Sequence, residues 1–212
     1  MPGGKETNMS YNGIDVSSYQ GSIDWSRVGK VHLDFAFVRA SMGPLSRDLR
    51  FKGNVAGAQG TGIKVGAYHY CNASSVAQAH AEAKNFLAAV KGLKLTYPLV
   101  LDLEYNSNTS KALSQWSDMA VAFLGDLEAA GYFAMLYSDK YSLENRFDPD
   151  KIAPFAIWVA QWGKACTYSR HFGVWQNSDT GTVSGISGNV DLDVSEYDYA
   201  GIIKNAGLNN LG

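Results

Sequence analysis

The sequence predicts an α/β protein, built as an irregular TIM-like (β/α) barrel of eight strands with an incomplete helical coat. Eight short apolar runs recur along the chain, and helical patterns separate several of them in the first two thirds. From Ala156 onward the runs follow one another through loops rich in Gly, Ser, Thr and Asn. A doubly wound open sheet is the alternative, but the chain lacks the Gly-rich phosphate loop of its nucleotide-binding versions.

The eight runs are nearly continuous in Val, Ile, Leu, Ala and Phe, which is typical of strands covered on both faces in a largely parallel sheet. Many of them end in polar or aromatic residues. We expect strands at residues 13–16, 35–39, 64–70, 98–104, 133–138, 156–161, 173–176 and 190–194.

Helices are predicted where apolar residues recur at intervals of three and four. Residues 75–90 follow this spacing after two serines and stop before Gly92, which matches the start and stop signals of a helix. Residues 110–130 repeat the pattern, and Gly131 ends it. Residues 48–59 form a weaker third helical pattern. The aromatic residues at this spacing are better explained by core packing than by a cofactor.

The length and composition favour one domain. The chain has 212 residues, of which 46% are hydrophobic, enough to bury a large core. We assign residues 11–205 to this domain, residues 1–10 to a disordered or added leader, and residues 206–212 to a C-terminal tail. Its net charge of −2 and pI of about 6.1 argue against nucleic acid or anionic membranes as partners. No apolar stretch is long enough to span a bilayer or to form a signal peptide.

The cysteines and histidines do not predict a metal site. Cys71 and Cys166 lack the paired spacing of zinc ligands and are too few for a disulfide framework. We expect buried or half-buried free thiols, although a single bridge between the two stays open. His69 has no second histidine at ligand spacing, so a hydrogen-bonded core histidine is expected. No metal and no cofactor are therefore predicted.

Carboxylates occur near the ends of the predicted strands, where barrel enzymes carry their working residues. Asp15 lies on the first strand, Asp102 and Glu104 on the fourth, and Asp191 and Asp193 on the last. A single acid at a strand end is usually a helix cap or a salt-bridge partner, but few Lys or Arg residues lie nearby to neutralise this set. Convergence on one pocket is the better interpretation.

The pair in the segment PLVLDLE carries the strongest chemical signal. Asp102 and Glu104 are two residues apart on a strand, so both side chains point into the barrel. Like charges at this distance raise at least one pKa, which provides a carboxylic acid that can protonate a glycosidic oxygen. The triplet alone is common, and its place at the end of an apolar strand makes it informative.

Aromatic and amide side chains gather at the other strand ends, and sugars favour such surfaces. Pyranose rings stack on aromatic faces, while their hydroxyl groups need directional hydrogen-bond partners. We expect about half of these aromatic residues to fill the core instead. The group comprises Tyr68, Tyr70, Tyr137, Trp158, Gln161, Trp162, Trp175 and Gln176.

A series of motifs in order resembles glycoside hydrolase family 25, the muramidase lysozymes of phages and of some bacteria and fungi. The resemblance spans residues 12–199. It rests on the order and spacing of several motifs, which together are a stronger signal than any one of them alone. They read GIDVSSYQG with IDW after it, FAFVRAS, VGAYHY, PLVLDLE, WVAQW, VWQ and GISGNVDLDV.

The resemblance implies cleavage, with net retention, of the β-1,4 bond between N-acetylmuramic acid and N-acetylglucosamine. It implies that Glu104 is the general acid/base and that Asp15, Asp102 and Asp191 surround it. The family often carries Asn two residues after its last acid, where this chain has Asp193. Residues at positions expected to contact sugar are Arg39, Tyr70, Tyr137, Trp158 and Gln176.

Three functions remain open: a retaining muramidase, which is favoured, a chitinase-like amino-sugar glycosidase, and a non-catalytic wall-binding module. The last has no need to hold like charges together. The expected partner is bacterial peptidoglycan, acted on by a monomer that is held in a host cytoplasm until lysis, or secreted if the chain is truncated. Members of the resembled family often carry separate wall-binding repeats, which this sequence does not show, so we expect the chain to be the catalytic domain of a longer lysin.

Overall fold

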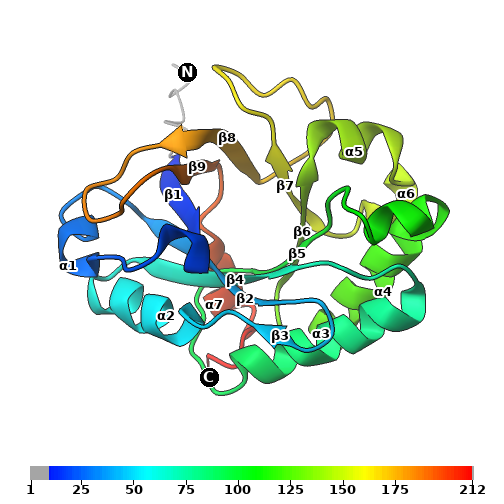
Figure 1. The fold of residues 1–212 in the computed structure, drawn as a ribbon, viewed down its shortest axis with the longest axis horizontal. Helices are drawn as coiled ribbons and strands as arrows, with labels where there is room; N and C mark the ends of the chain where they lie inside the picture. Colours follow the sequence, from blue (N-terminus) through cyan, green and yellow to red (C-terminus); the bar gives the residue numbers. More distant parts are fainter. Residues whose placement is uncertain (1–9, 212) are drawn as a thin grey trace, which may run out of the picture.

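Eight strands of one sheet close into a barrel in the computed structural model, which describes residues 10–211 (Figure 1). Pairing of the first strand with the second closes the ring, which confirms the predicted barrel and excludes the open sheet. The two-residue strand β3 (Ser46–Arg47) adds a hairpin to β2 and is not predicted. Around the ring lie β1 (Tyr11–Val16), β9 (Val190–Ser195), β8 (Val174–Gly181), β7 (Ala156–Ala160), β6 (Ala134–Asp139), β5 (Leu99–Asp102), β4 (Lys64–Tyr70) and β2 (Phe35–Met42).

The directions of the strands decide which residues meet at one end of the barrel. All neighbours from β1 through β2, β4, β5, β6 and β7 to β8 are parallel, as expected for buried apolar runs. The last strand, β9, runs antiparallel to both β8 and β1. Its N-terminal end therefore lies beside the C-terminal ends of the other strands.

The helices include the three that the sequence predicts, as α2, α3 and α4. In α3, the Ser75 side chain caps the first turn, and Gly92 follows the end with a φ of 79°. The helices are α1 (Trp25–Val28), α2 (Phe51–Gly60), α3 (Val76–Val90), α4 (Trp116–Ala129), α5 (Lys140–Asn145), α6 (Pro149–Ile152) and α7 (Tyr199–Asn205), with 3₁₀ helices η1 (Ser18–Gln20) and η2 (Thr109–Gln115).

The predicted helix over residues 110–130 is wrong in its first turns, which form η2 and are distorted at Ala112. Two side-chain hydrogen bonds explain the break. The Thr109 hydroxyl donates to the Glu104 carbonyl at 2.5 Å, and the Trp116 indole N–H donates to the Thr109 carbonyl at 2.9 Å. These bonds hold the segment against the end of β5 and delay the regular α-helix until Trp116.

Two apolar layers hold the barrel. The outer layer lies between the strands and α2, α3 and α4, which cover one side of the barrel, while the short helix α5 lies beside β6 and β7 (Figure 1). The inner layer fills the barrel with stacked rings, in which Trp158 lies 4.5 Å from Phe37 between ring centres. Tyr199 and Ile203 of α7 pack into this inner layer.

The segment after α7 also contributes to packing. Asn209, in the stretch expected to be a tail, is fully buried and donates to the carbonyls of Leu95 and Tyr97 at 2.9 Å. Its side-chain carbonyl accepts from the Phe133 N–H. Residues 1–9, which make up most of the predicted leader, lie outside the described residues, as does Gly212.

The remaining expectations concern buried polar groups. Cys71 is buried and Cys166 half-buried, and both are free thiols. His69 is fully buried between Ser41 and Glu82, with 2.8 Å from each ring nitrogen to its partner, so the expected core histidine is confirmed. Within residues 10–211, no helix combines the length and the apolar character that crossing a membrane requires.

Candidate active site

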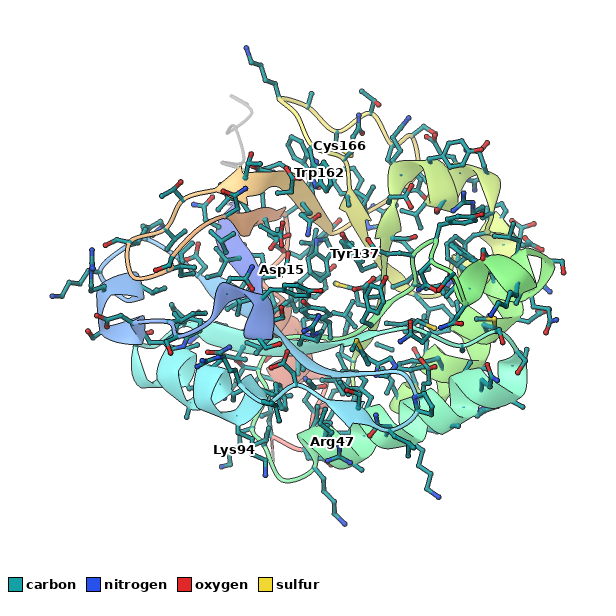
Figure 2. The ribbon with its side chains drawn as sticks, in the orientation of Figure 1. Asp15, Arg47, Lys94, Tyr137, Trp162 and Cys166 are labelled. Carbon is teal, nitrogen blue, oxygen red and sulfur yellow. The ribbon has the colours of Figure 1, made fainter. Side chains whose placement is uncertain are left out.

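A pocket of about 340 Å³ opens at the end of the barrel where the parallel strands terminate. Inward-facing residues alternate with residues of the outer apolar layer along the strands, so inward side chains near this end of the barrel line the pocket. Figure 2 shows Asp15 and Tyr137 near the middle of the molecule. The lining comprises Asp15, Ser17, Tyr19, Gln20, Arg39, Tyr68, Tyr70, Asp102, Glu104, Tyr137, Trp158, Trp162, Gln176 and Asp191.

All four acids expected to act together line this one pocket. Asp102 is the last residue of β5, and Glu104 lies just beyond it, so the predicted strand over 98–104 is too long at both ends. The ladder nevertheless continues in part, because the Leu103 N–H donates to the Tyr137 carbonyl at 3.1 Å. Leu103 faces the outer core, which leaves Asp102 and Glu104 on the same inner side.

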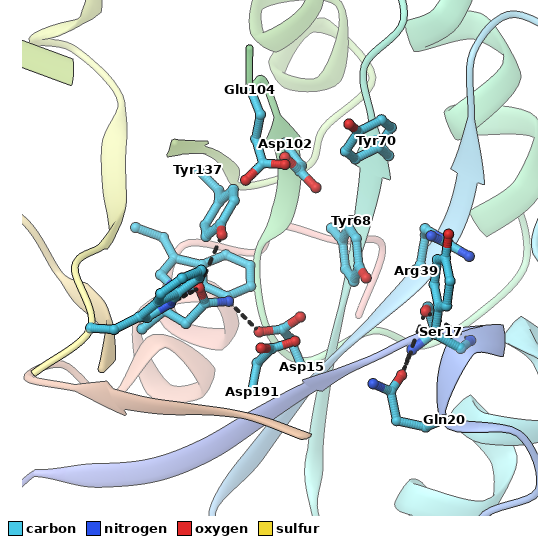
Figure 3. A pocket seen from close by; sticks show the side chains of 14 residues that line it. Asp15, Ser17, Gln20, Arg39, Tyr68, Tyr70, Asp102, Glu104, Tyr137 and Asp191 are labelled. Carbon is cyan, nitrogen blue, oxygen red and sulfur yellow. Dashed lines mark hydrogen bonds between the residues drawn. The ribbon is translucent and has the colours of Figure 1, made fainter. Parts of the chain in front are cut away.

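The opposite side of the pocket carries the second pair of acids (Figure 3). Asp15 and Asp191 are direct cross-strand partners between β1 and β9. Asp191 reaches the pocket from the start of β9, because this strand is antiparallel to its neighbours. The expectation that every acid of the site stands at the C-terminal end of a parallel strand is therefore wrong for Asp191. The Gln176 side-chain amide donates to Asp15 at 2.8 Å and fixes one carboxyl of the pair.

Burial and mutual repulsion raise the pKa of every acid in the pocket. The pKa of Asp102 lies well above its usual range, because the group is buried and faces Glu104 and Asp15. Burial and then Asp191 raise the pKa of Asp15. The pKa of Glu104 is raised by burial and by Asp139, and that of Asp191 by burial and by Asp179. Such a cluster retains protons to higher pH than isolated carboxyls do.

Asp193 lies beneath the pocket and does not line it. It is 2% exposed, and its Oδ1 accepts from the Trp158 indole N–H at 2.9 Å, while its Oδ2 has no hydrogen-bond partner among the described residues. Burial, followed by Asp15 and Asp191, raises the pKa of this carboxyl well above its usual range. The structure thus separates the two acids of the last strand, with only Asp191 at the pocket.

The residues expected to contact sugar all line the pocket, but they differ in exposure and in how far other side chains already engage them. Tyr70 is half-buried and lies on the wall. Trp158 is 2% exposed and forms part of the floor. Tyr137 donates to the Gln176 side-chain carbonyl at 3.0 Å, which orients the amide toward Asp15. Arg39 lies 3.0 Å from Asp48 and also donates to a serine hydroxyl, so its guanidinium is largely engaged.

Five further lining residues are not among the predicted site residues. Tyr68 and Trp162 belong to the aromatic group noted in the sequence, and Trp162 donates to Gln176 at 3.1 Å. Tyr19 and Gln20 lie in η1, and Ser17 is the residue that caps it and forms a capping box with Gln20. That spacing, Ser-x-x-Gln after a strand, is a readable signal for a short helical turn at this end of the barrel.

The chemistry of the pocket is that of carboxyl groups, amides and aromatic rings. Within residues 10–211, no group of three His, Cys, Asp or Glu side chains is arranged to hold a metal ion. The pocket can therefore donate and accept protons through its acids and hold a polar, ring-shaped ligand against its aromatic wall.

Comparisons with known proteins agree with this geometry. The sequence model of the glycosyl hydrolases family 25 matches residues 14–186. Lysozyme M1 of Streptomyces globisporus is 36% identical over 194 residues, which cover 84% of this chain and 65% of that protein. A bacterial lysozyme structure from Streptomyces coelicolor superposes with a TM-score of 0.79 at 30% identity, covering 95% of this chain and 98% of that one.

A third relative was solved with a synthetic peptidoglycan ligand. The modular autolysin LytC of Streptococcus pneumoniae, in complex with a synthetic peptidoglycan ligand, superposes with a TM-score of 0.78 at 26% identity, covering 91% of this chain and 47% of that one. This chain thus spans just under two thirds of Lysozyme M1 and about half of LytC. The matched range, the barrel and the acid pocket together identify the chain as a member of the glycosyl hydrolases family 25, as the sequence predicts.

Proposed function

We propose that this domain is an N-acetylmuramidase of the bacterial cell wall. It hydrolyses the β-1,4 bond between N-acetylmuramic acid and N-acetylglucosamine with retention of configuration. The observation that carries the proposal is the convergence of four acids from β1, β5 and β9 on one pocket with aromatic walls. The pocket lies within one chain, which supports action as a monomer.

Glu104 is the general acid in this proposal. Burial and the neighbouring Asp139 raise the pKa of Glu104, so its protonated form persists to a higher pH than that of an isolated glutamate. The protonated carboxyl donates to the glycosidic oxygen as the bond to C1 breaks. The resulting carboxylate then takes a proton from the water that attacks C1.

The nucleophile in this proposal is the N-acetyl group of the muramyl residue. Asp102 and Glu104 lie on one side of the pocket (Figure 3), whereas a nucleophilic carboxylate must approach C1 from the face opposite the acid. The acetamide carbonyl oxygen bonds to C1 while the glycosidic oxygen leaves with the proton of Glu104. Asp102 accepts a hydrogen bond from the acetamide N–H, which orients the group. Water then displaces the acetamide oxygen, so the two inversions give retention.

The sugar rings contact the aromatic and amide walls of the pocket. Tyr70 and the edge of Trp158 offer apolar surface for pyranose faces, and Gln176 and Tyr137 offer polar atoms near the acids. Arg39 lies at the wall in an ion pair with Asp48, which fixes the position of its guanidinium and balances its charge. These residues orient the ring and leave proton transfer to the carboxyl groups.

Digestion of purified peptidoglycan tests the proposed function. The new reducing ends are reduced with borohydride and identified by mass spectrometry. Muramic acid at those ends is the expected result. Glucosamine there would instead indicate a glycosidase of the other glycan bond, and the absence of cleavage would indicate a wall-binding module.

The nucleophile is tested separately. A thiazoline analogue of the cyclised acetamide should inhibit, and Asp102→Asn should cripple the enzyme, because both act on the step that closes the ring. A sugar attached covalently to Asp15 or Asp191 after reaction with a fluorinated muramyl substrate would instead make that aspartate the nucleophile.

A further inference from the structure

Outside the pocket lining, but next to Glu104 in the chain, lies a group of side chains that the proposed mechanism does not use. Tyr105 directly follows Glu104, while Tyr141 and Arg146 come from α5 and the position after it. The guanidinium carbon of Arg146 lies 4.2 Å from the ring centre of Tyr105 and 5.2 Å from that of Tyr141. We call these three residues the rim cluster.

The rim cluster is exposed although its rings are large. Tyr105 is 56% exposed and Tyr141 is 63% exposed. Together with Tyr19 and Trp162, which line the pocket, they are the four most exposed aromatic side chains of residues 10–211, and all four follow strands at the pocket end. Exposed aromatic surface gathered at one place is a common mark of a binding surface.

Arg146 is held in place by its neighbours, but among the described residues no carboxylate pairs with its charge. Its Nη1 donates to the Ser142 hydroxyl at 3.0 Å, and three rings, including Trp116 at 5.4 Å, surround its guanidinium. Among the described residues, no carboxylate lies within 4.0 Å of it, in contrast to Arg39, which pairs with Asp48. A guanidinium fixed by stacking loses little freedom when its remaining N–H groups bind a carboxylate.

The charges of the pocket determine where an anionic part of the substrate can lie. Four acids line the pocket and Asp193 lies under it. A negatively charged group of the substrate is therefore repelled from the centre of the pocket. The rim cluster offers the positive charge of Arg146, which stacks on the residue that follows Glu104 in the chain. An anionic substituent of the sugar chain is therefore best accommodated at Arg146.

We propose that the rim cluster binds a carboxylate of the stem peptide that the muramyl residue carries. The inference rests on the proposed function, because it assumes that a muramyl residue occupies the pocket. The peptide is amide-linked to the sugar next to the cleaved bond, and its free carboxylates are the negative charges nearest to that bond. Arg146 pairs with one of them, and the faces of Tyr105 and Tyr141 pack on the peptide's apolar atoms.

Chemical amidation of the substrate provides the test. The same purified peptidoglycan is used untreated and after carbodiimide coupling to ammonia, which neutralises its carboxylates and leaves the glycan bonds intact. Initial rates are measured for the wild type, for Arg146→Gln and for the control Arg170→Gln. Arg170 is exposed and lies beside Phe155, just ahead of β7 and hence at the opposite end of the barrel.

Arg146→Gln should raise KM for untreated peptidoglycan about tenfold with little change in kcat, since the contact exists in ground and transition states alike. Amidation should raise the wild-type KM by a similar factor and leave that of Arg146→Gln unchanged, and Arg170→Gln should behave as the wild type. An unchanged wild-type KM after amidation overturns the proposal without needing a folded variant. An equal rise in wild type and Arg146→Gln overturns it too, while failure of the wild type to cleave either substrate instead refutes the muramidase.

Discussion

Replacement of Asp193 by Asn should affect stability more favourably at neutral pH than at acidic pH. The Asp193 carboxyl is 2% exposed, and its Oδ2 lies buried without a hydrogen-bond partner and near Asp15 and Asp191. An Asn at this position keeps an acceptor for the Trp158 indole N–H. The pKa of Asp193 is raised well above the usual range, mainly by burial. The folded state therefore binds this proton more tightly than the unfolded chain does.

The sign of the pH dependence follows from this difference. Below the unfolded pKa of about 3.8 both states are protonated and the group carries no penalty. As the pH rises toward the folded pKa, the unfolded chain ionises first and stability is lost. Each unit between the two pKa values costs about 1.4 kcal/mol, or about 3–6 °C in Tm for a domain of this size.

Thermal unfolding at pH 7 and pH 3 measures the effect. The amide of Asn also lacks a partner, which costs about 1–3 kcal/mol at both pH values, so the change in ΔTm between them isolates the charge. We expect the Tm of Asp193→Asn minus that of the wild type to be more positive at pH 7 than at pH 3, by about 3–6 °C for each unit that separates the folded pKa from the unfolded one. The exposed Asp150→Asn serves as the control. An Asp193→Asn difference that is the same at both pH values would refute the reasoning.

Three further predictions concern the core and the chemistry. Glu82→Gln should lower the free energy of unfolding by about 1 kcal/mol in urea titrations, since a neutral amide oxygen accepts the 2.8 Å bond from the His69 ring more weakly than the buried carboxyl group does; an unchanged midpoint would contradict this. Gly66→Ala should cost about 1–3 kcal/mol in the same assay, because the new methyl group would lie 2.6 Å from the Pro98 carbonyl oxygen. Glycan cleavage should persist in a chelator, and inactivation reversed by zinc or calcium would reveal a missed metal site.

The barrel could be predicted because buried parallel strands leave long apolar runs in the sequence. The strand over 64–70 is predicted to the residue, and the start signal of α3 at Ser75 is read correctly. The direction of β9 could not be predicted, because a short alternating strand reads the same in both directions. That direction places Asp191 beside Asp15 and sends Asp193 beneath the pocket.

Tertiary hydrogen bonds account for the other differences. The hydroxyl of Thr109 binds the carbonyl of Glu104, and this contact across five residues breaks the expected helix into η2 and α4. Similarly, the position of Arg39 could be predicted, but its engagement by Asp48 depends on how the loop after β3 folds back. Contacts of this kind leave no periodic pattern in the sequence.

The rate of glycan cleavage by Glu104→Gln tests the account most directly. The amide keeps the shape of the side chain but cannot donate a proton, so turnover of purified peptidoglycan should fall about 10²–10⁴-fold. Thermal unfolding should show a folded protein, and the exposed Glu128→Gln should retain full activity as the matched control. Turnover close to that of the wild type by a folded Glu104→Gln protein would contradict the assignment of Glu104 as the general acid.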